Sequence, residues 1–247
     1  MDRHHDAARL LLSARRDPSQ RLHSLPEAMR PKTDTQATLV QRAIIAELGP
    51  IGGWKVGSPS PDGRINCSPL PASGIGDSPM TASGMLRGVE AEIGVRFAQG
   101  LPPREQPYSA DEVLAAVGSM HPIMEVLDSR YLDADAVDPL SNLADSMSHG
   151  GLAVGAPIES WRDVDLATER VRLLVDGAEV KARTANPAGG MVRLLVWLAN
   201  EGTRWAGGLQ AGQVATTGSW TGKDFVPEGG EARAVFARCG EAVVRFG

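Results

Sequence analysis

The stretch VEAEIGVRF, residues 89–97, is the part of this 247-residue sequence that says most about its fold. Its apolar residues Val89, Ala91 and Ile93 alternate with glutamates, and this period of two predicts a β-strand. The sequence RVRLLVDGAEVKA predicts a hairpin over 171–182 that turns at Asp176-Gly177. Similar strand-like runs are expected at 53–56, 122–127, 214–218, 232–237 and 242–246. The chain from residue 50 onward is therefore expected to be rich in β-structure.

Helical patterns dominate the first 49 residues instead. Apolar residues at helical spacing predict a helix over residues 1–15, and a second is expected from Thr33, where Thr33 and Gln36 have capping-box spacing, to Gly49. We therefore place a boundary between a helical segment, 1–49, that packs on the core and a β-rich catalytic domain, 50–247.

Isolated helices also interrupt the β-rich part. They are predicted over 109–117 and from Asn186-Pro187 to Gly202, while 58–79 is expected to form a long irregular loop. Because strands do not alternate strictly with helices, the predicted class is α+β rather than a doubly wound parallel sheet.

Composition excludes several classes of protein. A net charge of −5 argues against nucleic acid as a partner, and the absence of a run of about 18 apolar residues argues against a membrane span. Two cysteines are too few for a disulfide scaffold, and acidic residues in the first 17 positions do not suit a targeting peptide. The expected location is the cytoplasm. The sequence also lacks a complete P-loop, a dinucleotide fingerprint and a GxSxG elbow.

Carboxylates are the strongest chemical signal. On a strand, Glu90 and Glu92 share one face, where repulsion between them would be relieved by a hard divalent cation. The alternative is that they form the solvent side of a half-exposed strand. Glu125 lies within the apolar run PIMEVL, so it is either a third metal ligand or part of a buried ion pair, for which Arg130 is the suggested partner.

Other polar residues leave two interpretations open. Lys55, between glycines in GGWKVG, suits either a ligand site or an edge strand at the surface. The hydroxyls of Ser148, Ser219 and Thr221 are candidates to bind a substrate carboxylate, although their segments also suit turns. His149, like His121, has no partner at ligand spacing, so neither histidine is expected to bind metal.

Taken in order along the chain, several motifs resemble the 2-keto-4-pentenoate hydratase branch of the fumarylacetoacetate hydrolase superfamily. The resemblance covers nearly the whole chain, and it lies in the order and spacing of the motifs more than in any one of them. They are PKTDTQATLVQRA, GWKVG, VEAEIGV, EVLDSRY, ADSMSHGGLAVG, VWLAN, LQAGQVATTGSWTG and AVVRFG.

This resemblance implies a mixed β-sheet roll with a helical N-terminal lead-in. It further implies that Glu90, Glu92 and Glu125 hold a divalent metal, Mg²⁺ or Mn²⁺, that Lys55 enters the active site, and that Asp77 helps to position it. Two segments depart from the family pattern. Residues 146–150, SMSHG, replace Asn-Ala-Ser-Ser-Gly but keep a hydroxyl at Ser148, and 185–187 replace Gly-His-Pro.

The activity implied is the addition of water to 2-hydroxypenta-2,4-dienoate, or a close relative, to give a 4-hydroxy-2-oxo acid in the breakdown of aromatic compounds. A 2-oxo-3-hexenedioate decarboxylase is the first alternative, and it would need a further cation, for which Arg130, Arg183 and Lys223 are candidates. The others are an acylpyruvate-type C–C hydrolase and a non-catalytic partner subunit. The resemblance also implies a homo-oligomer, and it leaves room for a complex with a decarboxylase or aldolase of the same pathway.

Overall fold

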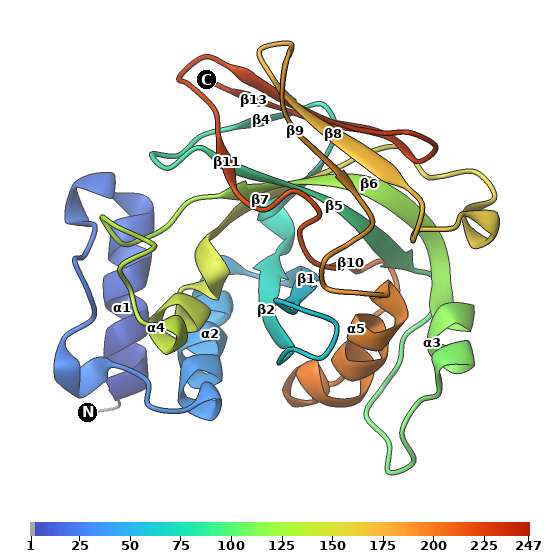
Figure 1. Cartoon of the computed structure of the whole chain (residues 1–247). Coiled ribbons are helices and arrows are strands. Elements are labelled where there is room, and N and C mark those ends of the chain that lie inside the picture. Colours follow the sequence, from blue (N-terminus) through green and yellow to red (C-terminus); the bar gives the residue numbers. More distant parts are fainter. Residues whose placement is uncertain (1–2) are drawn as a thin grey trace.

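Two β-sheets form the centre of the fold in a computed structural model that describes residues 3–247 (Figure 1). The first sheet has the strand order β2-β1-β10-β5-β6-β7-β3, with the short strand β11 also paired to β5. Its strands are β1 (Ile51–Gly57), β2 (Asn66–Pro71), β3 (Ile75–Asp77), β5 (Gly88–Phe97), β6 (Val117–Leu127), β7 (His149–Val154), β10 (Val214–Thr216) and β11 (Asp224–Phe225).

The second sheet has the order β4-β13-β12-β8-β9. Its strands are β4 (Met80–Ala82), β8 (Arg170–Val175), β9 (Ala178–Thr184), β12 (Glu231–Phe236) and β13 (Gly240–Phe246). The predicted hairpin at Asp176-Gly177 is confirmed as β8 and β9. Side chains between the two sheets form the main apolar core, which includes an edge-on contact between the rings of Trp220 and Phe236.

The helices form two groups on the side of the first sheet, below it in the view of Figure 1. The helices α1 (Arg3–Arg16), α2 (Asp34–Leu48) and α4 (Pro139–Ala144) share a second apolar cluster that also contains Tyr131. Away from them lie α3 (Ala110–Ala116) and α5 (Met191–Trp197). The predicted helix over 1–15 is confirmed from Arg3 onward, and its first two residues lie outside the described part. The boundary at residue 49 stays a prediction.

Two predicted helix starts follow from side-chain caps. The Thr33 hydroxyl accepts a hydrogen bond from the Gln36 backbone N–H, and Ser109 and Glu112 form a complete capping box. A cap of this kind satisfies backbone donors that the helix itself cannot use.

The capping box leads to a stability prediction. Changing Ser109 to alanine should lower the free energy of unfolding by about 1 kcal/mol, because it leaves the Glu112 backbone N–H without its acceptor. Urea unfolding measures this loss, and Ser109→Asp, which keeps an acceptor, should behave like the natural protein. Equal stability of the alanine and aspartate variants would contradict the assignment.

The predicted helix start at Asn186-Pro187 is wrong. The helix begins at Met191 with Gly190 as its N-cap, and it continues as a π-helical turn over Leu198–Gly202. Asn186 instead accepts a hydrogen bond from the Ala188 N–H and donates to the backbone oxygens of Thr217 and Gly218. The Asn-Pro pair thus forms a turn that ties two loops together rather than a helix cap.

The prediction of an irregular loop over 58–79 is also wrong, because β2 and β3 lie within it. Pro69 and Pro71 argued against a strand at β2, because proline cannot donate to a ladder of backbone hydrogen bonds. β2 is the outermost strand of its sheet and pairs only with β1, and at such an edge proline is tolerated.

The α+β class is confirmed. Within residues 3–247, the structure has no helix long and apolar enough to cross a bilayer.

Candidate metal centre and active site

Three glutamates converge on one face of the paired strands β5 and β6. Glu90 lies directly opposite Glu125 in the antiparallel register, and Glu92 is two residues further along the same face. One carboxylate oxygen from each lies within 4.8 Å of the others. Glu92 and Glu125 are fully buried and Glu90 is partly buried, so the solvent-facing alternative does not hold for this face.

The opposite face of β5 explains why the carboxylates point together. Val89, Ala91 and Ile93 all pack into the core between the two sheets. Because side chains alternate along a strand, burial of these apolar residues directs Glu90 and Glu92 to the other face.

Burial raises the free energy of the ionised carboxylates in this cluster. Neither oxygen of Glu92 accepts a hydrogen bond of ordinary geometry within residues 3–247. Burial, followed by repulsion from Glu125 and Glu90, raises the pKa of Glu92 well above its usual value. A hard divalent cation with oxygen ligands would offset this repulsion, so the donor set fits Mg²⁺ or Mn²⁺.

Lys55 contributes positive charge to the same cluster from β1. Its Nζ lies 3.0 Å from Glu125 Oε2 and 3.8 Å from Glu90 Oε2, and it donates a hydrogen bond of 3.2 Å to the Met147 carbonyl. Burial alone would lower the pKa of Lys55, but the three carboxylates, Glu125 foremost, raise it above its usual value. The Lys55 side chain is only 12% exposed, so the surface-lysine alternative is wrong.

Glu125 also contacts His149, for which the sequence indicated no partner. His149 Nδ1 lies 3.3 Å from Glu125 Oε1. Burial would raise the pKa of Glu125, but Lys55 and His149 lower it below its usual value. The suggested ion pair between Glu125 and Arg130 is wrong, since Arg130 pairs with Asp145 instead. His149 and Glu125 lie 24 residues apart on neighbouring strands, beyond the reach of a spacing rule.

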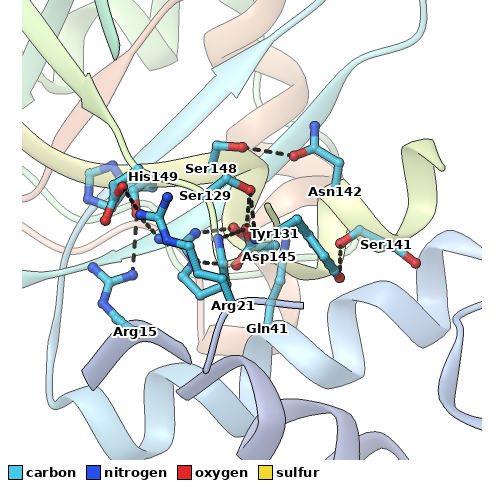
Figure 2. A network of polar contacts seen from close by, with 12 residues as sticks. Arg15, Arg21, Gln41, Ser129, Tyr131, Ser141, Asn142, Asp145, Ser148 and His149 are labelled. Carbon is cyan, nitrogen blue, oxygen red and sulfur yellow. Dashed lines mark hydrogen bonds and ion pairs between the residues drawn. The ribbon is translucent and has the colours of Figure 1, made fainter. Parts of the chain in front are cut away.

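The segment 146–149 links this cluster to the helical side of the molecule. Ser146, Met147 and Ser148 all have positive φ, at 53°, 51° and 60°. Figure 2 shows the surrounding network, in which Arg15 reaches the His149 carbonyl and the Ser148 hydroxyl meets the Asn142 side chain. Three left-handed residues in a row are costly, so the surrounding contacts must hold this turn in place.

A cavity of about 280 Å³ opens beside the cluster. Lys55 and Glu90 line it together with Ser148, Asp135 and Lys223. Lys223 Nζ lies 2.6 Å from Asp135 Oδ1. Burial raises the pKa of Glu90 above its usual value, and the charges of Lys55 and Lys223 oppose that rise. The cavity therefore places two lysines and one of the clustered carboxylates around a space suited to a small acid.

Comparison with known proteins assigns the family. Residues 75–246 match the family described as fumarylacetoacetate (FAA) hydrolase C-terminal. The chain belongs to the fumarylacetoacetate hydrolase family. The expected family fold is confirmed: this family member superimposes on a 4-oxalocrotonate decarboxylase from Pseudomonas putida G7, complexed with magnesium and adipate, with a TM-score of 0.83. The two are 23% identical, and the match covers 98% of this chain and 97% of that one.

Two further relatives match this family member less completely. A 4-oxalocrotonate decarboxylase from Pseudomonas sp is 34% identical over 113 residues, which is 44% of this chain and only 42% of the relative. A 2-hydroxyhepta-2,4-diene-1,7-dioate isomerase from Mycobacterium marinum has a TM-score of 0.55 at 17% identity, over 80% of this chain and 75% of that one. The superfamily expected from the motifs is therefore confirmed, whereas its hydratase branch stays a prediction.

The remaining predicted residues of this fumarylacetoacetate hydrolase family member lie at different distances from the cluster. The Ser219 hydroxyl is close enough to Glu90 to oppose the rise that burial causes in the pKa of that carboxyl, and it accepts a hydrogen bond from the Gly222 N–H. The Thr221 hydroxyl is buried and already engaged, accepting from the Ala91 N–H and donating to the Gly222 carbonyl. Asp77 is exposed on the edge strand β3, and no hydrogen bond or ion pair in residues 3–247 joins it to Lys55.

Proposed function

We propose that this family member is a metal-dependent decarboxylase of a 2-oxo dicarboxylate of the 2-oxo-3-hexenedioate type, acting in the breakdown of aromatic compounds. One observation carries the proposal: the cavity beside the three glutamates is lined by two lysines, Lys55 and Lys223. A substrate with carboxylates at both ends needs two positive partners besides a metal. The names of the related decarboxylases support the same choice.

Of the three cations considered for the distal carboxylate, Lys223 suits the role best. Arg130 is buried and engaged with Asp145 and the His149 carbonyl. Arg183 is exposed on β9, a strand of the other sheet. Lys223 is partly exposed and lines the cavity, and Asp135, its present partner, is 79% exposed, so a substrate carboxylate can displace it at small cost.

The residues present suggest how the reaction is assisted. A divalent cation held by Glu90, Glu92 and Glu125 would supply Lewis-acid polarisation of the substrate's 2-oxo group. Lys55, kept protonated by its three carboxylate neighbours, can donate a hydrogen bond to an oxygen of the 2-oxo acid end. Cleavage of the bond between C5 and the distal carboxyl releases carbon dioxide and leaves its electron pair in a dienolate that extends to the C2 oxygen. A proton on that oxygen then gives 2-hydroxypenta-2,4-dienoate.

Lys223 provides a test of substrate class. Changing Lys223 to methionine should raise KM for 2-oxo-3-hexenedioate about 10-fold and change kcat less than about 3-fold, because an ion pair that is kept from the bound dicarboxylate to the transition state contributes equally to the binding of both. Steady-state rates of carbon dioxide release measure both constants. The matched control is Arg183→Met, which removes an exposed cation from the other sheet and should leave KM unchanged. Equal KM values for all three proteins would contradict the role of Lys223.

The hydratase reaction is the other outcome of a direct assay. The protein, with added Mg²⁺ or Mn²⁺, is offered 2-oxo-3-hexenedioate and 2-hydroxypenta-2,4-dienoate in parallel, with carbon dioxide and ultraviolet absorbance recorded. Metal-dependent carbon dioxide release supports the proposal. Loss of the dienoate without carbon dioxide release would replace it by the hydratase. Inactivity on both, in a protein that binds neither metal, would favour the non-catalytic partner subunit. The homo-oligomer and a complex with a pathway enzyme stay predictions.

A further inference from the structure

The two oxygens of Glu125 are held by two different side chains. Oε2 faces Lys55 Nζ at 3.0 Å, while Oε1 faces His149 Nδ1 at 3.3 Å. The first of these contacts is an ion pair and the second a hydrogen bond. Glu92 makes neither an ion pair nor a hydrogen bond of ordinary geometry within residues 3–247, although the Thr216 hydroxyl is close enough to oppose the rise in its pKa. Of the two fully buried glutamates, Glu125 is therefore the one whose carboxylate plane is fixed by the protein itself.

The backbone of His149 is held in place by two arginines. The His149 carbonyl accepts hydrogen bonds from Arg130 Nη1 at 2.9 Å and from Arg15 Nη1 at 3.3 Å. Asp145 binds Arg130 through its side chain and its backbone oxygen, all of it buried. These contacts join helix α1 and the loop after α4 to the first residue of β7, and so fix the backbone from which the buried ring projects (Figure 2).

The same segment also fixes Lys55. The Met147 carbonyl, in the middle of the left-handed turn, accepts a hydrogen bond from Lys55 Nζ. A carbonyl two residues before His149 thus holds the lysine, while the histidine ring holds the glutamate. Lys55 and Glu125, which lie on different strands, are aligned by one short stretch of chain.

We propose that His149 is a positioning residue of the metal centre, donating its ring N–H to Glu125 and so holding that carboxylate in the orientation that binds the cation. The inference rests on the proposed metal-dependent function. A carboxylate ion can only accept hydrogen bonds, so the nitrogen that faces Glu125 carries the proton. Groups that hydrogen-bond metal ligands in this way typically contribute 10- to 100-fold to metal affinity.

The geometry separates this role from catalysis. His149 is buried and does not line the cavity that Lys55 and Glu90 share. Its other ring nitrogen, Nε2, has no hydrogen-bond partner in the described part of the chain and faces the backbone at Gly74. The histidine therefore acts through Glu125 and does not reach a substrate in the cavity.

Binding of Mn²⁺ to the purified protein, measured by titration calorimetry and by the loss of the free-ion electron paramagnetic resonance signal, tests the role. We expect His149→Ala to bind Mn²⁺ 10- to 100-fold more weakly, and His149→Asn to stay within about 3-fold of the natural protein, because the asparagine amide can occupy the place of Nδ1. His149→Gln, whose amide reaches the place of Nε2 instead, should bind as weakly as the alanine variant.

His121 supplies a matched control. It is also buried, and it lies on β6 four residues before Glu125, but its ring bonds Ser119 and the Gly155 carbonyl rather than a glutamate. His121→Ala should leave Mn²⁺ affinity unchanged. Thermal unfolding of each metal-free variant identifies any that fail to fold, and the Asn and Gln pair then decides the question without the alanine variant.

The outcomes separate the inference from the proposed function. If the natural protein does not bind Mn²⁺, the metal-dependent function itself is overturned. If the natural protein binds Mn²⁺ and the Asn and Gln variants of His149 bind it equally well, the positioning role is overturned while the metal centre stands.

Discussion

Replacing Lys55 by methionine is expected to lower the free energy of unfolding of the metal-free protein by about 3–5 kcal/mol, the usual cost of removing one partner of a buried ion pair. Lys55 is the cation nearest to both Glu125 and Glu90. Without it, three carboxylates face one another in a buried space, and Glu125 keeps only the His149 contact.

Added Mg²⁺ should restore much of that stability, because the cation takes over the neutralising role of the lysine. Chemical unfolding of the variant with and without Mg²⁺ measures this effect, and turnover should stay below about one thousandth of the natural rate in both cases. Lys55→Arg is the control: it keeps the charge, and should keep most of the metal-free stability, but its planar group does not reproduce an ammonium. A methionine variant as stable as the natural protein without metal would contradict this account of the cluster.

Glu92→Gln is expected to weaken metal binding and activity but to stabilise the metal-free protein. Mg²⁺ affinity and activity should both fall by more than about 100-fold, because one of three charged ligands is lost. The metal-free protein should become more stable by about 1 kcal/mol, or roughly 2–4 °C in its thermal midpoint, because burial and the charges on Glu125 and Glu90 disfavour an ionised Glu92.

Calorimetric titration with Mg²⁺ and thermal unfolding without metal measure the two effects of Glu92→Gln. The control is Glu47→Gln on the exposed side of α2, which removes the same charge far from the cluster and should change neither quantity. A Glu92 variant that loses stability without metal would mean that the carboxylates do not repel one another. Unchanged Mg²⁺ affinity would exclude Glu92 as a ligand.

Local signals in the sequence predicted much of the fold. Period-two alternation located β5, the Asp-Gly pair located the hairpin of β8 and β9, and the caps at Thr33 and Ser109 located two helix starts. Prediction failed where one residue type is typical of two different local structures. The prolines of β2 indicated a loop although they lie in an edge strand. Asn186 indicated a helix cap although its side chain stabilises a turn.

In the candidate site, too, features within one segment were predictable and contacts between distant segments were not. The shared face of Glu90 and Glu92 follows from their spacing, because it depends on a single strand. Their approach to Glu125 depends on the register between β5 and β6, and the approach of Lys55 depends on β1 reaching the same layer through β10. No pattern within one segment encodes such pairings. For that reason the sequence indicated no partner for His149, which contacts Glu125 across neighbouring strands.

The prolines at the edge of the first sheet bear on how copies of this chain can meet. A strand at an edge normally presents free backbone donors that invite pairing with another molecule, and such pairing leads to fibres and aggregates. Pro69 and Pro71 interrupt those donors on β2, while β9, at an edge of the second sheet, alternates charged side chains at Glu179, Lys181 and Arg183. Growth of a continuous intermolecular sheet is therefore blocked at both of these edges. A homo-oligomer of this protein would therefore not form by strand pairing at β2 or β9, and these two edges should not start aggregation at high concentration.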